Sequence, residues 1–153
     1  IRYNEHIIRR PDPARPMKPH YLFDTNVVVL TLFPGIQESI IRHVLDAPEL
    51  RSIVMRSYGS GNAPQQPWLN KLLYQAAHRG VVIVNISQCV AGSVEMSRYD
   101  TGYHLKKAGV ISGIDSTVEA AVTKLMFLQG QYSDSNIIRN MMCRSIAGEI
   151  TIE

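Results

Sequence analysis

The sequence has few of the features that mark secreted or membrane proteins. It contains only two cysteines, Cys89 and Cys143, in 153 residues, too few for the disulfide framework of a secreted domain. No apolar run approaches the roughly twenty residues needed to cross a bilayer. Ile7-Ile8 is followed at once by Arg9-Arg10, so the continuous apolar region of a signal peptide is missing. We therefore expect free thiols, no membrane partner and a cytoplasmic location.

Charge and histidine placement argue against a nucleic-acid or metal site. The net charge is +3, and residues 1–20 hold five Lys or Arg against two Asp or Glu, so the rest of the chain is neutral. A nucleic-acid-binding face needs clustered cations. The five histidines are far apart and lack cysteine or carboxylate neighbours at ligand spacing. We expect no nucleic-acid partner, no metal and no cofactor.

Residues 1–20 are expected to form an extended interdomain linker, or arm, ahead of an α/β domain over residues 21–153. Four of the eight prolines fall in this segment. Each proline fixes its own φ and biases its predecessor toward extended backbone, so the segment builds no core of its own. A chain that opens on a linker resembles the second part of a longer protein.

From residue 26 onward, strand and helix patterns alternate. Apolar, β-branched runs predict four strands, over residues 27–32, 53–58, 81–86 and 110–111, the first continuous enough to be buried on both faces. Helical spacing predicts five helices, over residues 36–45, 68–79, 101–107, 116–129 and 133–142, with Ile40 and Ile137 on buried sides. Ser116 and Glu119 have capping-box spacing. The alternation predicts a Rossmann-like, three-layer α/β sandwich, with a parallel sheet of about four strands and helices on both faces.

The stretch Arg56-Ser-Tyr-Gly-Ser-Gly-Asn-Ala-Pro64 follows the second predicted strand and precedes the second helix. Open α/β sheets bind ligands outside the carboxyl ends of their strands. Gly59 and Gly61 permit close approach of a ligand or a partner's backbone, and Arg56 and Asn62 supply donors for a carboxylate or an amide. A guanidinium at the end of a buried strand indicates a fixed anionic partner. That partner is either an Asp or Glu of the fold or a ligand carboxylate.

The third predicted strand ends in Ser87-Gln88-Cys89, so polar side chains follow two neighbouring strands. Cys89 is either a small buried residue or a ligand contact. A nucleophilic role would need an activating base, and no histidine is near it in sequence.

Together the ordered motifs resemble the C-terminal domain of bacterial type I, cytoplasmic L-asparaginases. The resemblance covers residues 27–150, and the segment before it resembles the family's interdomain linker. It is carried by Pro34-Gly35, the stretch from Arg56 to Pro64, Asn85-Ile-Ser-Gln-Cys89, Tyr99-Asp-Thr-Gly102, Ala108-Gly-Val-Ile-Ser-Gly113 and Asp115-Ser-Thr-Val-Glu-Ala-Ala121.

The resemblance implies a divided enzyme. In that family a larger N-terminal domain carries the threonine nucleophile and the groups that activate it, so no catalytic residue is assigned here and the isolated chain is expected to be inactive. The smaller domain completes the neighbouring subunit's active site through its glycine-rich loop, which implies substrate contacts by Gly61 and Asn62. A regulatory asparagine site is implied at Arg56, Ser87 and Cys89. The implied partners are L-asparagine or L-aspartate, the catalytic N-terminal domain, and further copies in a dimer or tetramer.

Two hypotheses from other classes remain open. The first is a self-contained nucleotide- or anion-binding module that uses Gly59-Ser-Gly61 as a phosphate cradle. That motif lacks the third glycine of a dinucleotide fingerprint and the lysine of a phosphate loop. The second is a purely structural oligomerisation domain.

Overall fold

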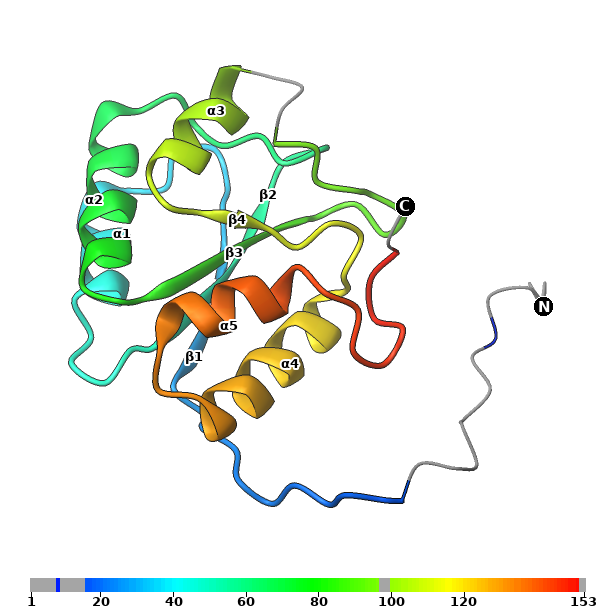
Figure 1. The fold of residues 1–153 in the computed structure, drawn as a ribbon. Helices are drawn as coiled ribbons and strands as arrows, with labels where there is room; N and C mark the ends of the chain where they lie inside the picture. The colour runs from blue at the N-terminus through cyan, green and yellow to red at the C-terminus, as the bar shows by residue number, and fades with distance from the viewer. Residues whose placement is uncertain (1–7, 9–15, 97–99, 152–153) are drawn as a thin grey trace.

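Four parallel strands form one sheet, in the order β1-β2-β3-β4. The computed structural model describes residues 8, 16–96 and 100–151. The strands are β1 (Val27–Thr31), β2 (Ser52–Ser57), β3 (Val82–Ser87) and the short β4 (Ile111–Ser112). Parallel neighbours require long crossover connections, and a helix supplies each of them (Figure 1).

The helices cover both faces of the sheet. α1 (Glu38–Leu45), α2 (Pro67–His78) and α3 (Asp100–Lys107) lie on one face, and α4 (Val118–Gln131) and α5 (Ser135–Met142) lie on the other (Figure 1). Successive side chains of a strand point to opposite faces. Met55 therefore joins the core under α1–α3, while Val54 joins the core under α4 and α5. The predicted three-layer α/β fold with a four-stranded parallel sheet is confirmed.

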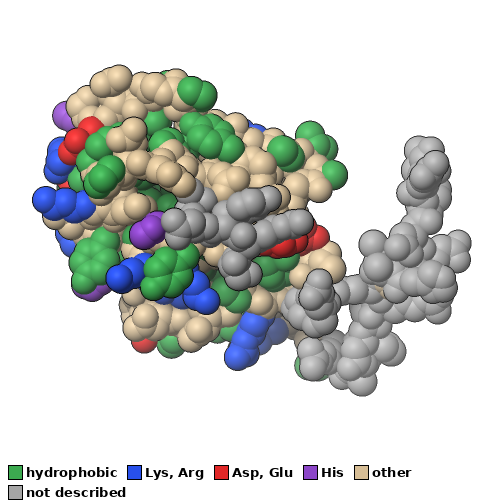
Figure 2. Space-filling view, turned by 90° about the horizontal axis from the view of Figure 1, so that it is seen from above, with side chains coloured by type: hydrophobic (Ala, Val, Ile, Leu, Met, Phe, Trp, Pro, Cys, Tyr) green, Lys and Arg blue, Asp and Glu red, His purple; other side chains and the backbone are tan. Residues whose placement is uncertain are grey.

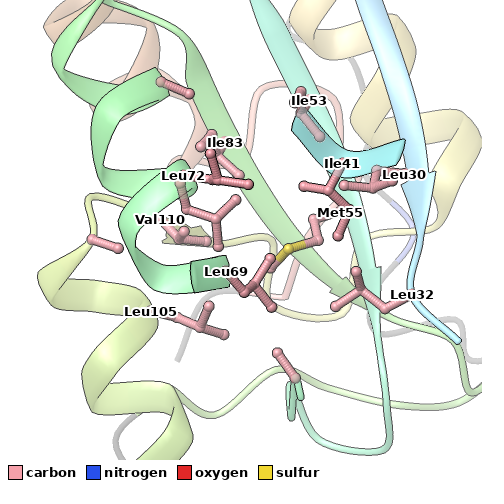
Figure 3. Close-up of a cluster of buried hydrophobic side chains, with 14 of the residues drawn as sticks. Leu30, Leu32, Ile41, Ile53, Met55, Leu69, Leu72, Ile83, Leu105 and Val110 are labelled. Atoms are coloured by element: carbon pink, nitrogen blue, oxygen red, sulfur yellow. The ribbon is translucent and has the colours of Figure 1, made fainter. Parts of the chain in front are cut away.

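The larger core fills the space between the sheet and α1–α3 (Figure 3). Side chains from three strands and three helices meet there, and each is buried: Leu30, Ile53, Met55, Ile83, Ile41, Leu69, Leu72 and Leu105. Burying one such side chain stabilises the fold by about 1.5–3 kcal/mol. This packing fixes the strands, and with them the positions at which β2 and β3 end.

β1 is an edge strand, and the prediction that it is buried on both faces is wrong. It pairs only with β2. Leu30 is buried, but Val29, which points to the opposite face, is 43% exposed. Val27 packs against the α4–α5 core, whereas Thr31 is exposed. The helical cover therefore ends part-way along the strand and leaves the carboxyl end of that face open.

Two further sequence expectations are wrong. Thr117 caps α4 by accepting a hydrogen bond from the Ala120 backbone N–H at 3.2 Å, whereas the Ser116 hydroxyl donates to the Thr117 backbone oxygen. Ile40 and Ile137 are 50% and 42% exposed. Helical spacing defines a stripe of apolar residues, but only packing decides how much of the stripe is covered.

The segment after α5 is fastened to α4 by a buried ion pair. Lys124 Nζ lies 2.6 Å from Glu149 Oε1, and the two side chains are 5% and 12% exposed. Lys124 also donates to the Met142 backbone oxygen, and Glu149 accepts from the Ile146 and Ala147 amides. Burial acts to raise the pKa of Glu149, but the hydrogen bonds from Lys124 and these amides outweigh it and lower the pKa to about 2.

The chain ahead of β1 runs along α4. The His20 ring packs edge-on against Phe127, with centroids 5.4 Å apart, and His20 Nδ1 lies 3.0 Å from Gln131 Oε1. The Leu22 backbone passes so close to Gly130 that a Cβ there would lie 2.1 Å from the Leu22 oxygen. The last residue of the expected arm thus contacts the domain, while most of residues 1–15 lie outside the described residues.

Candidate functional site

The stretch after β2 forms a tight turn at the carboxyl edge of the sheet. Tyr58 and Asn62 exchange two backbone hydrogen bonds of 2.8 Å, and the Gly61 amide donates to the Tyr58 oxygen at 3.0 Å. Gly59 and Gly61 have φ values of 47° and 109°, in the region that glycine adopts most readily. The glycines therefore close the turn, and Asn62 stands on its return side.

Two side chains of β3 hold this turn from the sheet. Asn85 Nδ2 donates to the Gly61 backbone oxygen at 3.1 Å, and Ser87 Oγ donates to the Gly59 oxygen at 2.6 Å. Asn85 is fully buried, and an added Cβ at Gly61 would lie 2.8 Å from Val94 Cγ1. The loop is thus fixed on the sheet before any ligand arrives. Figure 2 looks onto this side of the molecule, where uncharged polar and backbone atoms occupy much of the upper surface.

Gln88 joins the ends of three strands. Its side-chain Nε2 donates to the Leu32 and Arg56 backbone oxygens at 2.7 and 3.0 Å, and its amide donates to the Ser57 oxygen. The sequence alone predicts no role for Asn85 or Gln88, although both lie in the motif Asn85-Ile-Ser-Gln-Cys89. A buried asparagine within the apolar strand Val-Ile-Val-Asn-Ile-Ser was the available signal, since buried polar groups need partners.

Arg56 lies on the α4 face of the sheet. It occupies the same face as Val54 and is flanked in register by Thr31 and Ile86. The buried Arg56 Nε has no hydrogen-bond partner among the described residues. No acidic side chain in the described part of the chain forms an ion pair with Arg56. The Arg56 guanidinium, at the open end of this face, can therefore still donate to an anion.

Ser87 points to the opposite face, toward the loop, as its bond to Gly59 shows. Its oxygen also accepts a hydrogen bond from the Cys89 amide at 2.9 Å. Cys89 is exposed, and both it and Cys143 are free thiols, as expected. All three expected effector residues thus follow or end neighbouring strands, but Arg56 and Ser87 lie on different faces of the sheet.

An open cavity of about 370 Å³ adjoins the loop. Its wall is formed by the end of the loop, the start of α2 and part of α3: Ala63, Pro64, Gln65, Pro67, Asn70, His104 and Leu105. Within the described ranges no group of three or more His, Cys, Asp or Glu side chains could hold a metal ion. The helices that the structure describes include none long and apolar enough to cross a membrane.

Comparison with known proteins assigns this arrangement to a family. The sequence profile of the Glutaminase/Asparaginase C-terminal domain matches residues 26–142. The chain belongs to this family. The Glutaminase/Asparaginase C-terminal domain formed by these residues contains β1 to β4, the loop and the helices through α5. The predicted resemblance to the C-terminal domain of L-asparaginases is confirmed.

Individual relatives agree with the family. L-asparaginase 1 of Escherichia coli is 40% identical over 151 residues, covering 95% of this chain and 44% of that protein. The 60 kDa lysophospholipase of Homo sapiens is 37% identical over 152 residues, covering 99% of this chain and 26% of that protein. The crystal structure of L-asparaginase I from Vibrio cholerae matches with a TM-score of 0.86 at 38% identity, covering 92% of this chain and 42% of that one. The chain thus spans less than half the length of these relatives.

Proposed function

We propose that this domain is the C-terminal part of an L-asparaginase, which converts asparagine and water to aspartate and ammonia. Its role is to complete the active site of a neighbouring subunit. The observation that carries the proposal is the preformed loop, held to β3 through the Gly59 and Gly61 oxygens in a domain of this family. Such a fixed polar loop provides contacts without an ordering cost on binding.

Gly61 and Asn62 are the proposed substrate contacts. The exchanged hydrogen bonds with Tyr58 fix the backbone of Asn62, and Asn62 itself is half-buried. Its amide side chain offers both a donor and an acceptor, which suits a substrate that carries a carboxylate and an amide. The threonine that attacks this amide would come from a catalytic N-terminal domain, and the enzyme would act as a dimer or tetramer.

Complementation between subunits tests this role. The chain is joined to the remaining part of E. coli L-asparaginase 1, in place of the region that it matches. One version carries Asn62→Ala, and the other an inactivated catalytic threonine. If Asn62 serves the neighbour, each version alone loses most activity. In a mixed dimer one of the two sites is intact, so an equal mixture with random pairing, in which half of the dimers are mixed, recovers about a quarter of the unsubstituted rate. Mixed dimers without recovered activity would contradict the proposal. Asn140→Ala, an exposed change on α5, is the matched control and should behave like the unsubstituted enzyme.

The second proposed role is binding of asparagine as an effector at Arg56, Ser87 and Cys89. The partly buried guanidinium of Arg56, which has no acidic partner among the described residues, supports it, because a ligand carboxylate would supply an anion with bidentate geometry. Cys89 would offer a soft contact from the exposed turn, whose backbone Ser87 holds in place. The lack of further cations on the strands beside Arg56 favours an amino acid over a phosphate.

We also propose that residues 1–20 form an interdomain arm. The two free thiols support a cytoplasmic location. The proposed chemistry requires no metal or cofactor. The family assignment favours the asparaginase hypothesis over a nucleotide-binding module or a purely structural domain.

A further inference from the structure

We propose that the carboxyl end of α4 is a docking site for residues 20–24, and that this site sets the direction in which the arm leaves the domain. Gly130 and Arg51 are the positioning residues of the site. The inference rests on the proposed function, because the direction of the arm matters only if the arm connects this domain to a catalytic part. Residues 20–24, the docking segment, run beside α4 before the chain enters β1 (Figure 1).

Gly130 lets the docking segment lie directly on the helix. Glycine is a poor helix former compared with alanine, yet it occupies the last turn of α4. A Cβ added at Gly130 would lie 2.1 Å from the Leu22 backbone oxygen and 2.8 Å from the Phe23 Cα. Both are backbone atoms, so rotation of a side chain cannot relieve the contact. The segment can therefore follow this path only across a residue that has no side chain.

Hydrogen bonds from α4 hold the backbone of the docking segment at two points. Gln131 Nε2 donates to the Leu22 oxygen at 2.9 Å, and Gln129 Nε2 donates to the Asp24 oxygen at 3.3 Å. The Asp24 amide donates to the Met126 backbone oxygen at 3.0 Å. Two points of attachment fix the direction of the segment, whereas a single point would let it pivot.

Arg51 fastens the corner at which the segment turns into β1. Its guanidinium donates to Asp24 Oδ2 at 2.7 Å and to the Gln129 and Tyr132 backbone oxygens at 3.2 Å each. These two oxygens belong to the carboxyl end of α4, where a cation is favourable. The Asn26 amide also donates to Asp24, and this bond, followed by that from Arg51, lowers the pKa of Asp24 and keeps its carboxylate charged. Arg51 thus joins the segment, α4 and the start of β2.

A fixed direction at residues 20–24 restricts where a part attached through the arm can lie. A linker that was free along its whole length would let that part sample a wide volume. In the proposed enzyme the nucleophile comes from the catalytic part and substrate contacts come from the loop of this domain. A misplacement of about 1 Å between reacting groups can cost on the order of a hundredfold in rate. The docking site should therefore affect turnover without contacting the substrate.

Hydrogen exchange measured by NMR on this chain alone tests the docking site. Gly130→Ala should raise the exchange rate of the Asp24 amide at least about tenfold, because displacement of Phe23 moves the peptide group that carries this amide. Gln131→Ala removes one hydrogen bond to the segment without adding an atom, and it should raise the rate by a smaller factor. Asn140→Ala, an exposed change on α5, is the control and should leave the rate unchanged. An unchanged Asp24 rate in Gly130→Ala would overturn the docking site.

Turnover of the chain joined to the remaining part of E. coli L-asparaginase 1 tests the positioning role. In Gly130→Ala the kcat for L-asparagine should fall at least about tenfold, while the Tm of the chain alone should shift by less than about 3 °C. Asn140→Ala should keep the unsubstituted kcat. A raised Asp24 exchange rate with an unchanged kcat would overturn the positioning role and leave the proposed function intact. An inactive unsubstituted joined enzyme would contradict the proposed function, and the positioning role would fail with it.

Discussion

Gln88 and Leu32 are joined across the full width of β2. The Gln88 side-chain amide passes the end of that strand, donates to the Arg56 oxygen at 3.0 Å, and reaches the Leu32 oxygen beyond β1 at 2.7 Å. The ends of β1, β2 and β3 are therefore one hydrogen-bonded unit, and both proposed sites lie on it. Geometry at this edge is set by side chains from β3 and from the turn after it.

Replacement of Gln88 by alanine should destabilise the domain by about 1–3 kcal/mol, because partly buried backbone oxygens of Leu32 and Arg56 lose a donor. Chemical denaturation of the variant chain measures this. Gln75→Ala, at an exposed position on α2, should change stability by less than about 0.5 kcal/mol. Equal effects of the two changes would show that Gln88 does not tie the strand ends together.

Gly61 should tolerate alanine much less well than Gly59. At Gly61, φ is 109° and a new Cβ would lie 2.8 Å from the stiff Val94 side chain. At Gly59, φ is 47° and nothing lies within 4 Å of the new Cβ. We expect losses of about 2–4 kcal/mol for Gly61→Ala and about 1 kcal/mol for Gly59→Ala. Thermal or chemical denaturation checks the order, and the reverse order would contradict the described loop.

The Lys124–Glu149 pair should make the domain sensitive to acid. The Glu149 pKa is lowered to about 2 in the folded chain from an ordinary value of 4.5. A lowered folded pKa stabilises at pH values above the unfolded pKa, so this contribution is present above pH 4.5 and is lost as the pH falls toward 2. The loss should be on the order of 3 kcal/mol at most. Denaturation midpoints measured between pH 7 and pH 2 would show it.

Glu149→Gln should reduce the loss of stability between pH 4.5 and pH 2. It should also lower the free energy of unfolding at pH 7 by about 3 kcal/mol, because the buried Lys124 loses its counterion. Glu38→Gln is the control, since the Glu38–Arg42 pair is exposed and such pairs contribute about 0–1 kcal/mol. If Glu149→Gln lost as much stability at low pH as the unsubstituted chain, the pH dependence would come from other carboxylates.

Asparagine should stabilise the chain weakly through Arg56. At a concentration equal to its Kd, a ligand that binds only the folded state adds about 0.4 kcal/mol, which a thermal-shift titration detects as a small rise in Tm. Arg56→Ala should abolish the rise, and Arg56→Lys should reduce it, because lysine cannot form the bidentate pair. Arg42→Ala, at an exposed site on α1, should leave it unchanged. If asparagine still raised the Tm of the Arg56→Ala variant, the role of Arg56 would be structural and not ligand binding.

Much of the fold could be predicted from the sequence, because periodicity records which residues are buried. All nine helices and strands of the described chain lie where the patterns indicated. The errors concern how much of an apolar element is buried by its neighbours. The run from Val27 to Thr31 shows that the strand is apolar, but it does not show where the helix packed on the strand ends. The choice of Thr117 over Ser116 as the cap of α4 likewise depends on the backbone angle at which the chain enters the helix.

The candidate site was predicted only in part. The carboxyl edge could be located, because parallel strands end together and polar residues follow β2 and β3. The hydrogen-bond partner of Ser87 could not be predicted, because Gly59 is 28 residues away and their contact depends on the path of the loop. The placement of Arg56 and Ser87 on different faces of the sheet could not be predicted either, because it depends on where each strand begins and how the two strands are paired.

Ammonia release from L-asparagine, measured side by side for two proteins, tests most directly whether this domain needs a separate catalytic part. The first is this chain alone, and the second is the same chain joined to the remaining part of E. coli L-asparaginase 1. We predict no release by the chain alone, because none of its residues is assigned as an activated nucleophile, and release by the joined enzyme. Asparagine hydrolysis by the isolated chain, from a preparation free of host asparaginase, would overturn this prediction. A folded, oligomeric joined enzyme without activity would contradict it as well.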